Sequence, residues 1–79
     1  NIDIYNNLTI NFKNKNVVFS GMTDSKLEET IKHMSGYIQD NVNNKTDILI
    51  VKSINKQTKK IKKAQELNKI IIEYSNIFK

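Results

Sequence analysis

A nearly uninterrupted apolar run in the middle of the chain, residues 47–51 (Asp-Ile-Leu-Ile-Val), constrains the fold more than any other feature. Strands with one solvated face alternate apolar and polar side chains, whereas a central strand of a parallel sheet is covered on both faces and is apolar throughout. The run therefore predicts a central strand of a parallel sheet. Because helices must cover both faces of such a sheet, it also predicts a three-layer α/β architecture.

A second apolar run, residues 17–20, ends in Ser20 and Gly21 and leads into a helical pattern that opens at Asp24 and Ser25. Ligands of parallel α/β sheets bind at the carboxyl ends of strands. A serine hydroxyl and an unobstructed glycine N–H both suit an anionic oxygen. Ser20 and Gly21 are therefore a candidate anion site, unless the pair only closes the strand.

The helix after this turn is predicted from apolar residues at i, i+4 and i+7, which form one stripe: Leu27, Ile31 and Met34. Asp24 or Ser25 can cap its start. Gly36 lies where a helix-ending glycine is expected. The lone histidine, His33, lies beside the stripe and is expected to be a surface residue rather than a ligand.

The rest of the chain predicts strands over 37–40 and 70–72, a helix over 57–68 and the start of a last helix over 74–78. The second helix turns Ile61, Ala64 and Leu67 inward and its lysines outward. Residues 1–11 are expected to be a lead-in or linker, or an edge strand. Residues 12–79 then form a single domain with the order strand, helix, strand, strand, helix, strand, helix.

The composition excludes several classes of protein. The chain has 79 residues and no cysteine, so it has no disulfide framework or thiolate metal site, and one histidine cannot build a zinc site. We expect no metal and no cofactor. No apolar run is long enough to span a bilayer and no signal peptide is evident, which predicts an intracellular module, nuclear or cytoplasmic, without a membrane partner. Because Asn1 is not an initiator methionine, we expect a domain cut from a longer chain.

The positive charge is concentrated in residues 52–69, which hold seven lysines and one acidic residue, Glu66, in a chain of net charge +5. Basic residues gathered on one element attract polyanions such as nucleic acid or phosphorylated partners. A solvated lysine-rich helix face is the alternative. The chain has no Arg, so bidentate recognition of phosphate or guanine by arginine is excluded.

Residues 12–79 resemble a BRCT domain in a series of short motifs. These are Phe-Lys-Asn-Lys (12–15), Val-Val-Phe-Ser-Gly (17–21), Gly-Tyr (36–37), Asn-Lys-Thr-Asp-Ile-Leu-Ile-Val (44–51) and Lys-Ala-Gln-Glu-Leu-Asn (63–68). Lys-Lys-Ala-Gln-Glu-Leu (62–67) is similar to the C-terminal BRCT domain of NAD-dependent DNA ligases. The BRCT domain of the replication factor C large subunit is also similar. The chain departs from the family at Tyr37 and Asn68, where glycine is usual, and at Ile77, where an aromatic residue is usual.

The resemblance implies a four-stranded parallel sheet in the order 2-1-3-4, flanked by three helices. It also implies a phosphate pocket that contains a lysine. In phosphate-binding relatives this lysine lies four residues before the small residue of the second helix and eight before the glycine that ends the helix. Counting from Ala64 and from Asn68 gives Lys60. The expected phosphate site is therefore Ser20, Gly21 and Lys60. The expected secondary contacts are Lys56, Thr58, Lys59 and Lys63.

The chain lacks a phosphate-binding loop motif and a recognisable catalytic triad, so we expect no catalytic residue and a non-catalytic domain. One hypothesis is a replication or repair module, in a NAD-dependent DNA ligase, that binds DNA through backbone phosphates or a 5′-terminal phosphate. The alternative is a module that binds a phosphopeptide or another protein, such as a phosphoprotein. A third is a purely structural role, packing against other domains of the parent chain.

Overall fold

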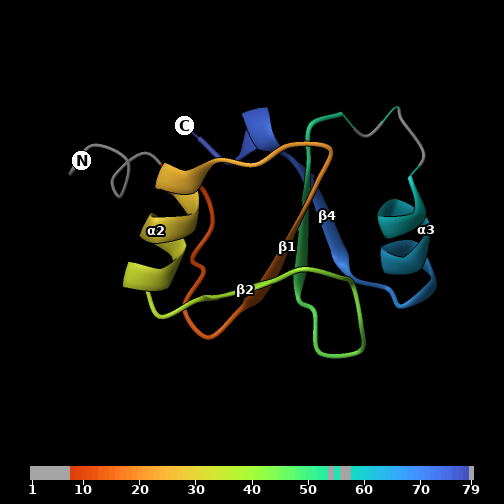
Figure 1. The fold of residues 1–79 in the computed structure, drawn as a ribbon, viewed down its shortest axis with the longest axis horizontal. Coiled ribbons are helices and arrows are strands. Elements are labelled where there is room, and N and C mark those ends of the chain that lie inside the picture. The colour runs from red at the N-terminus through yellow and green to blue at the C-terminus, as the bar shows by residue number, and fades with distance from the viewer. Residues whose placement is uncertain (1–7, 54, 56–57, 79) are drawn as a thin grey trace.

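The computed structural model describes residues 8–53, 55 and 58–78. In chain order its elements are β1 (Asn16–Ser20), α2 (Ser25–His33), β2 (Tyr37–Gln39), β3 (Ile48–Val51), α3 (Lys59–Glu66), β4 (Ile70–Glu73) and the 3-10 helix η1 (Tyr74–Asn76). Figure 1 shows α2 and α3 on opposite faces of the sheet. The three-layer α/β architecture predicted from the apolar runs is therefore confirmed.

The four strands form one parallel sheet in the order β2-β1-β3-β4. This is the order that the family resemblance implied. Ser20, the last residue of β1, lies opposite Val51, the last residue of β3. The carboxyl ends of the two central strands are therefore adjacent, and the segments that follow them leave the sheet at the same end of the strands.

The central strands are apolar throughout because their alternate side chains enter two separate cores. The core under α2 contains Leu8, Phe12, Val17, Phe19, Leu27, Ile31, Ile48, Ile50 and Ile77. The core under α3 contains Val18, Val42, Leu49, Val51, Ile61 and Ala64. Residues of β3 thus alternate between the two sides, as expected for a strand buried on both faces.

Asp24 caps the first helix, since its carboxylate accepts hydrogen bonds from the Lys26 and Leu27 backbone N–H groups. Gly36 lies at the other end, where a helix-ending glycine is expected, but it does not have the left-handed conformation usual for such a glycine. Ser35 adopts that conformation, with φ 67°. Gly36 is needed for space instead, because a Cβ there would lie 2.6 Å from the Ile31 side chain and 2.8 Å from the Phe12 carbonyl oxygen.

The second helix, predicted over 57–68, is α3 and begins at Lys59. Residue 57 lies outside the described residues. Thr58 caps α3 by accepting a hydrogen bond from the Ile61 N–H. Asn68 ends it in the left-handed conformation, with φ 57°, which asparagine tolerates better than most residues. Asn68, where the resemblance gives glycine as the usual residue, therefore adopts a conformation that glycine favours.

The third helix is a correction to the expected architecture. In the part of the chain that the structure describes there are two α-helices, and the segment expected to start a third forms only the single 3-10 turn η1. The chain cannot continue as a helix because Ile77 and Phe78 pair with residues near the amino terminus. The Thr9 N–H donates to the Ile77 carbonyl at 2.7 Å, and Leu8 forms an antiparallel bridge with Phe78.

Residues 8–11 of the expected lead-in thus contact the end of the domain, and Leu8 is buried in the core under α2. Ile77, which stands where relatives have an aromatic residue, is fully buried in the same core. Among the described residues, no helix is long and apolar enough to cross a membrane.

Thr46 and Asp47, which precede β3 in the 44–51 motif, form hydrogen bonds that fix neighbouring loops. Thr46 is fully buried, and its hydroxyl donates to the Gln39 side chain and accepts from the Asn43 N–H. The Asp47 carboxylate accepts from the Asn16 N–H at 2.8 Å, at the start of β1. This motif therefore fixes the amino-terminal end of the sheet, opposite the end that carries Ser20.

Candidate functional site

Ser20 and Gly21 lie where β1 ends. The amino end of α3 points toward this same end of the strands (Figure 1). The Ser20 side chain is largely buried, with 5% of the residue exposed. Gly21 is exposed, has φ 78°, and a Cβ added to it would meet only Lys52 Cβ, at 4.0 Å. The Gly21 backbone can therefore be approached closely by a ligand.

Thr58 connects this turn to the second helix. Its Oγ1 lies 3.1 Å from Ser20 Oγ and accepts the Ile61 N–H at 3.2 Å. A hydroxyl group has one proton and can accept as well as donate. When Thr58 donates its proton to Ser20, the Ser20 proton is available to a ligand.

Lys60 extends from α3 back over the end of β1. Its Nζ donates to the Phe19 carbonyl oxygen at 3.0 Å, next to Ser20 in the chain. The Lys60 side chain is half-buried. The structure thus brings the four residues Ser20, Gly21, Thr58 and Lys60 to one end of the sheet, from two segments about 40 residues apart in the sequence.

A cavity of about 280 Å³ opens at this end of the sheet. Its walls are Ser20, Gly21, Val51, Lys52, Ser53, Thr58 and Ile61. Lys60 is not among the described residues of its wall, because the Lys60 amine is held on the Phe19 carbonyl. Placing this amine in the cavity requires a change of its side-chain rotamer.

The sequence prediction missed Lys52 and Ser53, which belong to the cavity wall because they follow β3. The signal was present: parallel strands end at one edge of the sheet, so polar residues after the second central strand should lie near those after the first. Lys52 and Ser53 begin that segment.

The other predicted contacts divide by position. Lys59 and Lys63 are exposed on α3 and line, together with Lys60, an open hollow of about 270 Å³ whose other wall is Asn41 and Val42. Lys56 lies outside the described residues. A hollow with three lysines in its wall therefore lies on the α3 side of Lys60, next to the candidate site.

Acidic groups lie on the other side of Lys60. A smaller hollow of about 140 Å³ contains Lys60 together with Glu28 and Asp40. These carboxylates would repel a polyanion. Of the two hollows that Lys60 lines, the one on α3 is therefore the electrostatically favourable path for a nucleic-acid strand.

The loop between Gly21 and α2 is anchored from the far end of the chain. The Tyr74 hydroxyl donates to Asp24 Oδ2, and this hydrogen bond is the main cause that lowers the pKa of Asp24 below its ordinary value. The same bond, with burial, raises the pKa of Tyr74. Tyr74 also packs edge-on against Phe78, with ring centroids 5.2 Å apart.

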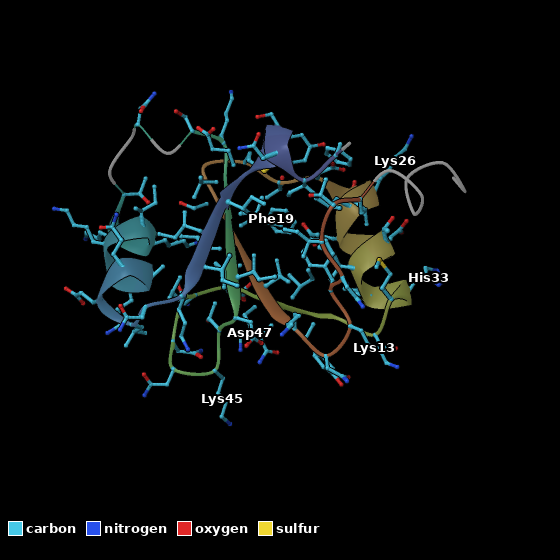
Figure 2. All side chains as sticks on the ribbon, turned by 180° about the vertical axis from the view of Figure 1, so that it is seen from behind. Lys13, Phe19, Lys26, His33, Lys45 and Asp47 are labelled. Carbon is cyan, nitrogen blue, oxygen red and sulfur yellow. The ribbon has the colours of Figure 1, made fainter. Side chains whose placement is uncertain are left out.

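In the described part of the chain, no three His, Cys, Asp or Glu side chains gather as they would around a metal ion. His33 lies exposed on α2, and Figure 2 shows it away from Phe19, the residue before Ser20. The site is therefore composed of hydroxyl, backbone N–H and lysine groups, which are donors suited to an oxyanion.

A comparison with curated proteins finds no match to this chain. A family model, that of the BRCA1 C Terminus (BRCT) domain, matches residues 7–79, which is nearly the whole length. The match agrees with the α/β fold and with the parallel sheet in the order β2-β1-β3-β4. The chain belongs to the BRCT domain family.

Proposed function

We propose that this BRCT domain binds DNA through phosphate, with a 5′-terminal phosphate held by Ser20, Gly21 and Lys60. The observation that carries the proposal is that the Ser20 hydroxyl and the open Gly21 backbone line a cavity beside the amino end of α3, with the Lys60 amine held next to Ser20 on the Phe19 carbonyl. The positive end of a helix dipole adds to the attraction for an anion.

Lys60 would exchange a neutral acceptor for a charged one when phosphate binds. In the free protein its amine donates to the Phe19 carbonyl at 3.0 Å. Hydrogen bonds between ionised partners are shorter and stronger than those to a neutral carbonyl. Rotation of Lys60 toward the cavity is therefore favourable only when a phosphate occupies it.

DNA is favoured over an isolated phosphate by the charges around the site. Lys59 and Lys63 continue the positive surface along α3, and Lys52 lies beside the cavity. These lysines offer contacts to backbone phosphates that give affinity without base recognition. The domain itself is proposed to be non-catalytic and intracellular, within a replication or repair protein such as a NAD-dependent DNA ligase, whose BRCT domain has a similar 62–67 segment.

The test is a titration of fluorescent duplex DNA with a 5′-phosphate against the same duplex with a 5′-hydroxyl. We expect the phosphorylated duplex to bind about tenfold or more tightly, since hydrogen bonds to charged groups contribute about 1.5–3 kcal/mol each. Ser20→Ala and Lys60→Met should remove this preference. Lys62→Met is the matched control, because Lys62 is exposed on the same helix and is not among the described walls of the three hollows.

Equal affinity of the wild-type protein for the two duplexes would contradict the terminal-phosphate site. If Lys62→Met removes the preference as fully as Lys60→Met does, charge alone accounts for binding. In that case the role of Ser20 and Gly21 is disproved.

A phosphopeptide is the second candidate, favoured by the apolar wall of the 280 Å³ cavity, to which Val51 and Ile61 contribute. Such a wall could accept an aliphatic side chain next to a phosphorylated residue. Saturable binding of a phosphoserine peptide, lost in Ser20→Ala and unaffected by competing DNA, would favour this function. Failure of both ligands to bind would leave a structural role within the parent chain.

A further inference from the structure

Among the described residues, the strand β4 forms one edge of the sheet, because the order β2-β1-β3-β4 gives it a strand neighbour on one side only. Figure 2 shows β4 in front of the other strands, with α3 to one side and α2 to the other. Such an edge presents backbone groups that can pair with a further strand.

The side chains of β4 do not protect this edge. Natural sheets protect their edges with lysine, proline, bulges or very short strands. The strand Ile70–Glu73 contains three successive isoleucines and neither lysine nor proline. Ile70 is 58% exposed, and Ile71 and Ile72 are half-buried. The edge is short, at four residues, but it is apolar and its side chains leave it open to pairing.

The hydrogen bond between the Ile70 N–H and the Asp47 carbonyl, 3.3 Å long, shows which β4 groups point outward. In a parallel pair, alternate residues direct their backbone groups to the same neighbour. Ile70 and Ile72 therefore face β3, and the N–H and carbonyl of Ile71 face away from it. Ile71 is thus the residue whose backbone is directed outward at the middle of this edge.

We propose that β4 pairs with β4 of a second copy of this chain, antiparallel, about a two-fold axis at Ile71. Two identical edges related by such an axis must run antiparallel. Ile71 then exchanges both backbone hydrogen bonds with Ile71 of the second copy, as outward-facing residues of an antiparallel pair do. The two sheets become one continuous sheet.

The same register is complementary in charge and shape. It places Lys69, whose amine donates to the Asn44 carbonyl of its own chain at 2.8 Å, opposite Glu73, so that residues of opposite charge lie across from each other at both ends of the joint. It also places Ile70 opposite Ile72. Directly opposed pairs of opposite charge or of β-branched residues stabilise antiparallel strands. A shift by two residues in either direction would instead place Ile71 opposite a charged residue. The exposed Ile70 would be covered in the dimer.

Sedimentation velocity over a range of concentrations tests the proposal. A joint of one short strand is expected to be weak, so the measurement should extend to about 1 mM protein. We expect reversible dimerisation that Ile70→Lys weakens about tenfold or more, because it places a charge in the joint. Tyr37→Lys is the matched control, since Tyr37 is equally exposed, at 58%, on the opposite edge strand β2.

A monomer throughout the concentration range would disprove the proposal. So would a dimer that Tyr37→Lys weakens and Ile70→Lys does not. Circular dichroism should show that both variants keep the wild-type fold. If Ile70→Lys does not fold, hydrogen exchange of the wild type decides, since the Ile71 amide should become more protected as concentration rises and the Ile70 amide should not.

A charge exchange tests the register itself. Lys69→Glu should weaken the dimer, because it places two carboxylates opposite each other, and the double change Lys69→Glu with Glu73→Lys should restore it. Failure of the double change to restore dimerisation would overturn the Ile71 axis. The test is independent of phosphate binding, since neither residue is among the described walls of the Ser20 cavity.

Discussion

Ser20 Oγ and Thr58 Oγ1 lie 3.1 Å apart, so the last residue of β1 and the capping residue of α3 are joined across 38 positions of sequence. The bond attaches the start of the basic helix to the turn that carries the candidate anion site. Because Thr58 also caps α3 through the Ile61 N–H, one hydroxyl serves both the stability of the helix and the orientation of Ser20.

Replacing Thr58 by valine should reduce both properties. We expect a loss of about 1 kcal/mol in the free energy of unfolding, which is typical of a lost helix cap, and weaker binding of 5′-phosphorylated DNA. Thr58→Ser should retain both, because it keeps the hydroxyl. In a double-mutant cycle with Ser20→Ala, the effects on affinity should not add, since the two residues are in direct contact. Strictly additive effects would show that the hydrogen bond has no role in binding.

The lysines of α3 should determine the salt dependence of DNA binding. Each phosphate contact that is lost lowers the slope of log K against log salt by about 0.9. We expect Lys59→Gln with Lys63→Gln to lower this slope by up to about 2. The control is Lys13→Gln with Lys45→Gln, a pair of exposed lysines that Figure 2 shows at the end of the sheet with Asp47, away from Phe19, the residue before Ser20. Equal slopes for the two double variants would contradict a DNA path along α3.

The hydrogen bond between Tyr74 and Asp24 should contribute stability over a defined pH range. The folded state lowers the pKa of Asp24 from 3.8, so its contribution is present above that pH and is lost as the pH falls through the lowered value. It raises the pKa of Tyr74 from 10.0, so that contribution is present below pH 10.0 and is lost as the pH rises toward the raised value.

Tyr74→Phe should therefore destabilise the domain by about 1 kcal/mol near neutral pH, because both groups are partly solvated and the bond is screened. Urea unfolding of the two proteins between pH 3 and pH 10 measures the difference. The two curves should converge at acid pH, where Asp24 is protonated. A difference that stays constant down to the lowest pH would show that the lost hydroxyl acts through packing rather than through the carboxylate.

The two glycines should respond differently to alanine. At Gly36 the added methyl would lie 2.6 Å from Ile31 and 2.8 Å from the Phe12 carbonyl, so we expect a loss of about 2–3 kcal/mol from overpacking in the core. At Gly21 nothing obstructs the methyl, and the cost of about 1 kcal/mol comes from its φ of 78° alone. Thermal unfolding of both variants measures this order. A larger loss at Gly21 would contradict the packing seen at Gly36.

By itself the sequence determined the layers, the strands and most helix positions. The runs Val17–Phe19 and Ile48–Val51 are apolar at every position, and a strand of this kind must be covered on both faces of the sheet. The stripe of Leu27 and Ile31 and the lysines around Ile61 and Ala64 then predict the two amphipathic helices that cover the sheet. These predictions hold because hydrophobic periodicity is a local property of the chain.

Only the tertiary structure decided how the chain ends and what surrounds the candidate site. Residues 74–78 have a helical pattern, but backbone pairing of Thr9 with Ile77 stops the helix after one 3-10 turn. The Lys60 amine is held on the Phe19 carbonyl beside the cavity rather than within it. These features depend on contacts between residues far apart in the sequence. A local sequence pattern cannot predict them, because it does not show which distant residues meet.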